Sequence, residues 1–105
     1  MVNYNLEKLF NDLSKKKTID KKKSYTSALL AEKNVLAKKI GEETFEVIIE
    51  YLNNNKKNVI KESADLLYHL SVLWISADVK PLDIWKELQK RKGISGFDEK
   101  KSRVN

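Results

Sequence analysis

Apolar residues recur at helical spacing through most of the chain. Over residues 4–14 they recur every three or four positions, which predicts a short amphipathic helix. Residues 35–52 carry a longer run of the same kind, which predicts a helix of four to five turns. Gly41 lies inside that run, where glycine costs about 1 kcal/mol relative to alanine. We therefore expect another part of the structure, such as a helix, to approach closely at Gly41.

The second half of the chain continues the helical pattern. The polar residues 53–58 predict a turn, and residues 59–79 are apolar on nearly every face, as in a helix that is buried all round. In so short a chain, such a helix needs a partner subunit to cover its far side. Pro81 suits the first turn of a last helix, which should close near Gly93. The fold predicted is an all-α bundle of four to five helices completed by homodimerisation.

Composition narrows the class of protein. A chain of 105 residues is expected to form a single domain, in which residues 1–21 supply an N-terminal helix and a lysine-rich connector and residues 22–105 carry the functional site. There is no cysteine, which excludes disulfides and thiolate metal sites. No apolar run approaches the length of about 18 residues that spans a bilayer. We expect a cytoplasmic protein with no membrane partner.

Four acidic residues form the most informative pattern. Glu46 and Glu62 each lie eight residues from Asn54, and Glu43 and Asp65 each lie eleven residues from it. If the two helices fold back at Asn54, all four carboxylates reach the same height, about 12 to 17 Å from the turn. Carboxylates gathered at one level repel one another unless a cation lies among them. Oxygen ligands of this kind suit Mg²⁺, with Mn²⁺ as a possible substitute.

Two interpretations of the acids remain at this point. Lys39 precedes Glu43 by four residues and Lys61 precedes Asp65 by four, so each acid could form an ordinary surface ion pair. Against this, Asp65 lies on the most apolar helix, where an unpaired carboxylate carries a large desolvation cost. We favour the metal site.

Several neighbouring residues have chemistry that suits such a site. Glu42 is rotated by about 100° from Glu43, and we expect it at the edge of the cluster, as a supporting group or as a base for an attacking water. Lys38 and Lys39 lie one turn before the acids and are candidates to hold phosphate oxygens. His69 follows Asp65 by four residues, and we expect it to be a hydrogen-bonded core residue that at most contacts an acid.

Four segments together resemble a known enzyme family, phosphoribosyl-ATP pyrophosphohydrolase, which belongs to the MazG-like all-α nucleoside triphosphate pyrophosphatases. The segments are residues 38–47, residues 62–70, the triplet Ser24-Tyr25-Thr26, and the ending Ser95-Gly96 with residues 99–103. The resemblance covers about residues 22–103. Residues 1–21 match no pattern associated with the family.

The resemblance implies a reaction and a set of roles. The family hydrolyses phosphoribosyl-ATP at the α–β phosphoanhydride to phosphoribosyl-AMP and pyrophosphate, the second step of histidine biosynthesis. It implies that Mg²⁺ is held by Glu43, Glu46, Glu62 and Asp65. It further makes Glu42 the candidate general base, Lys38 and Lys39 candidates for the triphosphate, and Ser24 and Tyr25 candidates for the phosphoribosyl side.

Two other functions compete with this one. A house-cleaning pyrophosphatase would act on free or modified nucleoside triphosphates. A basic helical module would instead bind nucleic acid or a protein through residues 15–23, which hold six lysines and one acid. Four acids at the centre of the fold would repel a phosphate backbone in the absence of metal, so we expect no nucleic-acid partner.

Overall fold

The computed structural model describes residues 1–93, and these residues form helices and no strand. The five α-helices are α1 (Leu6–Ser14), α2 (Tyr25–Ala31), α3 (Lys33–Leu52), α4 (Lys56–Ser76) and α5 (Pro81–Lys90), and a 3₁₀ helix, η1 (Lys15–Thr18), follows α1. The predicted all-α class is confirmed. The C-terminal part of the family-like pattern, Ser95-Gly96 and residues 99–103, lies outside the described residues.

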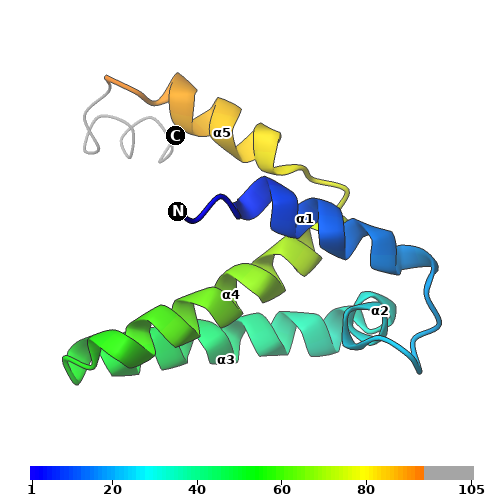
Figure 1. Cartoon of the computed structure of the whole chain (residues 1–105), viewed down its shortest axis with the longest axis horizontal. Coiled ribbons are helices and arrows are strands. Elements are labelled where there is room, and N and C mark those ends of the chain that lie inside the picture. The colour runs from blue at the N-terminus through cyan, green and yellow to red at the C-terminus, as the bar shows by residue number, and fades with distance from the viewer. Residues whose placement is uncertain (94–105) are drawn as a thin grey trace, which may run out of the picture.

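A helical hairpin of α3 and α4 is the longest feature of the fold (Figure 1). Asn54 makes the turn in the left-handed region, with φ of 58°, a conformation that asparagine tolerates better than most residues. Asn55 then caps α4, because its side chain accepts a hydrogen bond from the Asn58 N–H at 3.1 Å. The turn is therefore shorter than the predicted span 53–58, since residues 56–58 are already helical.

The remaining helices pack on the end of the hairpin away from its turn. Helix α1 crosses α4, α2 lies at the start of α3, and α5 packs against α1 (Figure 1). The core joins α1, α2, α3 and α4 through five buried residues, Leu13, Leu29, Leu36, Val72 and Ile75. On α5, the Trp85 indole N–H donates a hydrogen bond to the Glu7 carboxylate of α1.

Short-range hydrogen bonds fix the entry to α2. Ser24 caps this helix by accepting from the Ser27 N–H at 3.2 Å. The Ser27 hydroxyl donates in turn to the Lys16 carbonyl at 2.6 Å. This bond joins the lysine-rich η1 to the first turn of α2.

A large apolar area of the hairpin remains exposed. On α3, Phe45, Ile48, Ile49 and Leu52 form an exposed line that we name the α3 stripe, and Phe45 and Leu52 are 67% and 69% exposed. On α4, Ile60 is 66% exposed, so the prediction that this helix is buried all round is wrong for the single chain.

Gly41 also lies in open space. A Cβ atom built there would meet no atom within 4 Å among the described residues. The prediction that another part of the structure approaches Gly41 closely is therefore wrong within residues 1–93. In the same part of the chain, no helix is both long enough and apolar enough to cross a membrane.

Candidate metal centre

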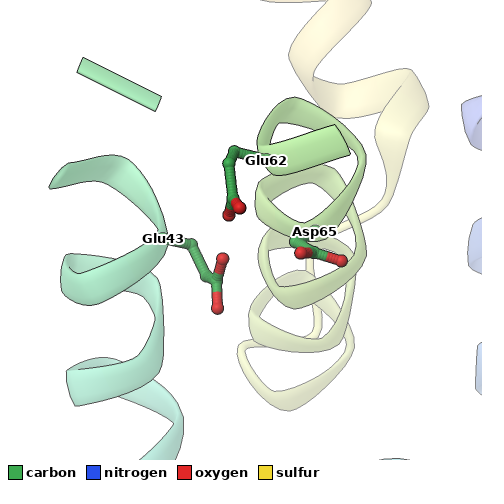
Figure 2. Close-up of side chains that lie close together, drawn as sticks. All are labelled: Glu43, Glu62 and Asp65. Carbon is green, nitrogen blue, oxygen red and sulfur yellow. The ribbon is translucent and has the colours of Figure 1, made fainter. Parts of the chain in front are cut away.

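Three carboxylates meet between α3 and α4. Glu43 extends from α3 toward Glu62 of α4, and Asp65 lies one turn further along α4 (Figure 2). One oxygen from each of the three lies within 4.8 Å of the others. The i, i+3 spacing of Glu62 and Asp65 places both on one side of α4, and the hairpin brings Glu43 to the same height. The predicted convergence of acids from the two helices is thus present for these three residues.

Two oxygen atoms in this cluster have no hydrogen-bond partner. They are Glu43 Oε2 and Glu62 Oε2, and both are inaccessible to solvent. A buried acceptor without a partner costs about 1 to 3 kcal/mol, and more when it is charged. A divalent cation would relieve this cost, and carboxylate oxygens are the ligands that Mg²⁺ and Mn²⁺ prefer. The residues present therefore fit such an ion.

Crowding of the acids shifts their pKa values. The pKa of Glu62 is raised from 4.5 to about 7, first by a hydrogen bond with Glu46, then by removal from water and by the charges of Glu46, Asp65 and Glu43. The pKa of Glu43 is also raised, mainly by removal from water and then by the charges of Glu46 and Asp65. Glu46 thus adjoins the cluster, although it is not one of the three acids with converging oxygens.

The nearby candidates for base and phosphate binding lie outside this trio. Glu42 forms an ion pair with Lys39 at 3.5 Å, and both side chains are about two-fifths exposed. Lys38 is exposed. Neither of the ion pairs considered from the sequence, Lys39 with Glu43 and Lys61 with Asp65, is present among residues 1–93. The acids of the trio are therefore free of lysine in this part of the chain.

Tyr25 and His69 are joined to each other beside the cluster. The buried His69 lies within hydrogen-bonding distance of the Asp65 main-chain carbonyl through Nδ1, at 2.8 Å, and of the Tyr25 hydroxyl through Nε2, at 3.1 Å. His69 therefore contacts an acidic residue, as expected, but through the main chain and not through the carboxylate. The sequence indicated the His69–Asp65 relation by its i, i+4 spacing. It held no sign of the Tyr25–His69 contact, which joins residues 44 positions apart.

Three relatives align with this chain over most of its length. A protein from Gluconobacter oxydans named phosphoribosyl-ATP pyrophosphatase is 43% identical over 99 residues, which cover 93% of this chain and 74% of that protein. A protein of the same name from Paramagnetospirillum magneticum is 46% identical over 100 residues, covering 94% of this chain and 92% of that protein. Phosphoribosyl-ATP pyrophosphatase 2 of Rhodopseudomonas palustris is 42% identical over 102 residues, which cover 94% of this chain and 78% of that protein.

The family comparison agrees with these relatives. Residues 4–92 match the family described as phosphoribosyl-ATP pyrophosphohydrolase. The match includes α1, so the expectation that residues 1–21 lie outside the family pattern is wrong. The match spans all five α-helices, and the three converging carboxylates lie within it. The chain belongs to the phosphoribosyl-ATP pyrophosphohydrolase family.

Proposed function

We propose that this protein hydrolyses phosphoribosyl-ATP to phosphoribosyl-AMP and pyrophosphate, the second step of histidine biosynthesis. Family membership supports the reaction, and relatives that are more than 40% identical over about 100 aligned residues carry the corresponding name. The observation that carries the proposal is the convergence of Glu43, Glu62 and Asp65, with two buried oxygens that lack a partner.

The proposed cofactor is Mg²⁺, for which Mn²⁺ can substitute. Glu43, Glu62 and Asp65 would hold it, together with Glu46, which adjoins both Glu43 and Glu62. When bound, the cation supplies positive charge that offsets the negative charge of the phosphates during hydrolysis. The family resemblance supports all four acids, and the geometry supports three of them directly.

The remaining roles belong to side chains around the cluster. In hydrolysis at the α–β phosphoanhydride, a water oxygen bonds to phosphorus, pyrophosphate leaves, and a base removes the water proton. Glu42 is the proposed base, and its carboxylate lies 3.5 Å from the Lys39 ammonium group. Lys38 and Lys39 are proposed to hold the triphosphate, with Ser24 and the exposed part of Tyr25 on the phosphoribosyl side.

The functional form is proposed to be a homodimer. Gly41 precedes Phe45 by four residues, so it lies on the same side of α3 as the α3 stripe, with open space above it. Exposed apolar lines of this kind mark interaction surfaces. A second copy of the chain packed on the α3 stripe would cover these residues and would give Gly41 the close neighbour that the single chain lacks.

Pyrophosphate release tests the reaction. Purified protein should release pyrophosphate from phosphoribosyl-ATP in the presence of Mg²⁺, much faster than from ATP or deoxynucleoside triphosphates, and a chelator should abolish the release. Equal rates on all triphosphates would instead indicate a house-cleaning pyrophosphatase.

Substitutions in the cluster test the site. Asp65→Asn and Glu46→Gln should each lower kcat on the order of 10²-fold or more while helicity is unchanged. Glu32→Gln is a matched control, because Glu32 is an exposed acid between α2 and α3 and is not one of the trio. Full activity in both cluster variants would remove the assignment.

A further inference from the structure

The hydrogen bonds of His69 define its orientation and the tautomer of its neutral ring. A main-chain carbonyl can only accept, so Nδ1 must carry a proton to bond with the Asp65 carbonyl. In the neutral ring Nε2 is then an acceptor, and the Tyr25 hydroxyl donates to it. The Tyr25 hydroxyl is therefore engaged on the protein itself, and its bond reaches the main chain of Asp65 through one imidazole ring.

Two neighbouring tyrosine rings pack edge to face against this ring. Tyr68 meets His69 edge to face with ring centroids 5.0 Å apart, and Tyr25 meets it in the same way at 6.0 Å. Tyr25 and Tyr68 lie nearly parallel, with an angle of 11° between their planes. The imidazole is thus fixed by contacts from α2 and α4, and its rotation is restricted.

Among residues 1–93, no hydrogen bond or ion pair orients the Asp65 carboxylate, and the Asp65 side chain is exposed. Its position therefore depends on the main chain of α4. The bond from His69 Nδ1 acts on the Asp65 carbonyl, the main-chain group next to that carboxylate.

We infer that Tyr25 and His69 form a positioning pair, which holds the Asp65 turn of α4 so that the Asp65 carboxylate stays directed into the cluster. The inference rests on the proposed function, because it assumes that the cluster binds a divalent cation. Groups that orient metal ligands typically change metal affinity by about 10- to 100-fold when they are removed. Neither residue needs to touch the cation or the substrate to have this effect.

Tyr25→Phe is the central variant, and Tyr68→Phe is its matched control. Both remove one hydroxyl that joins α2 to α4, since the Tyr68 hydroxyl is hydrogen-bonded to Thr26 Oγ1, but only Tyr25 is bonded to His69. Mn²⁺ affinity is measured by titration without nucleotide. We expect about 10-fold weaker binding in Tyr25→Phe and a change of less than about 2-fold in Tyr68→Phe.

Two substitutions at His69 distinguish the effect of its hydrogen bond to the Asp65 carbonyl from that of its hydrogen bond to Tyr25. Asparagine places an amide N–H near the position of Nδ1 but does not reach Tyr25, whereas leucine provides neither bond. We expect His69→Asn to bind Mn²⁺ more tightly than His69→Leu, with circular dichroism confirming that both are helical. If the leucine variant does not fold, the two tyrosine variants still decide the question.

Other outcomes would overturn either the positioning role of Tyr25 and His69 or the metal site itself. Unchanged Mn²⁺ affinity in Tyr25→Phe, or equal losses in Tyr25→Phe and Tyr68→Phe, would overturn the positioning role. A raised KM in Tyr25→Phe with unchanged Mn²⁺ affinity would also overturn the positioning role. It would make Tyr25 a substrate contact only. If Asp65→Asn also left Mn²⁺ affinity unchanged, the metal site itself would fail, and this is a distinct result from failure of the pair alone.

Discussion

Glu43 and Glu62 show at the scale of single residues why the cluster is suited to a cation. Each has one oxygen without solvent or hydrogen-bond partner, and each carboxyl has a raised pKa. Folding thus holds two acids in a place that disfavours their ionised form. A raised pKa means that each carboxyl holds its proton to a higher pH than in water, and a bound divalent cation would favour the ionised form instead.

This arrangement predicts how stability without metal depends on pH. Glu62 binds a proton more tightly in the folded state, with a pKa of about 7, than in the unfolded state near 4.5. The folded state therefore holds more protons between these values, and the free energy of unfolding falls as pH rises from about 4.5 through about 7. Glu43 contributes with the same sign. Urea unfolding at several pH values in a chelator measures the effect.

Glu62→Gln isolates the contribution of this residue. Glutamine cannot ionise, so the variant should show a smaller fall in stability between pH 5 and pH 8 than the wild type. Saturating Mg²⁺ should also remove most of the fall in the wild type, because the cation stabilises the carboxylate. Parallel curves for wild type and variant in chelator would contradict the assigned role of Glu62.

At the scale of the helices, the turn at Asn54 determines the height at which the acids meet. Left-handed Asn54 reverses the chain, and the Asn55 side chain starts α4 by accepting from the Asn58 N–H. The register of α3 against α4 depends on this turn, and so does the distance between Glu43 and Glu62. A change that shifts the turn should therefore affect both stability and the spacing of the acids.

Removal of the α4 cap tests the contribution of the turn. Asn55→Ala should lower the free energy of unfolding by about 1 kcal/mol, because one N–H at the start of α4 loses its acceptor. Asn53→Ala is the control, since Asn53 is an exposed residue at the end of α3 whose side chain makes no hydrogen bond among residues 1–93, and it should change stability by less than about 0.5 kcal/mol. Denaturant unfolding measures both. Equal effects of the two substitutions would contradict the cap.

The sequence predicted those features that depend on spacing along one helix or across one turn. The hairpin at Asn54 and the shared height of Glu43, Glu62 and Asp65 follow from local pattern. Contacts between distant segments did not follow, since Tyr25 meets His69 only when α2 packs on α4.

The sequence pattern also did not determine which charged side chains pair with each other within a helix. Lys39 can reach an acid three or four residues ahead, and the spacing does not choose between Glu42 and Glu43. The structure pairs it with Glu42 at 3.5 Å, which leaves Glu43 to face α4. This choice depends on tertiary packing, because Glu43 is directed into the hairpin and Lys39 remains partly exposed.

At the scale of the whole molecule, the single chain leaves much of its hairpin uncovered. The α3 stripe is exposed, and the space above Gly41 on the same side of α3 is open. The apolar pattern of residues 59–79 predicted that a partner subunit covers this helix. The exposure of Ile60 in the single chain agrees with that prediction. These observations support the proposal that two copies of the chain associate.

A charge in the α3 stripe tests the dimer. Phe45→Glu places a carboxylate at a residue that is 67% exposed in the single chain and that the dimer would bury, so it should shift the protein to monomer. Leu82→Glu is the control, because Leu82 is an exposed apolar residue on α5, away from the stripe. Sedimentation equilibrium gives the mass of each variant. A monomeric wild type, or a dimeric Phe45→Glu variant, would contradict the proposed interface.

The most direct test of the metal centre is the position of a bound ion. Crystals grown with Mn²⁺ should show an anomalous-scattering peak between α3 and α4, coordinated by oxygens of Glu43, Glu62 and Asp65. Glu62→Gln crystals prepared in the same way should show a weaker peak or none. Wild-type crystals with no peak at these carboxylates, or with Mn²⁺ bound only elsewhere, would contradict the account.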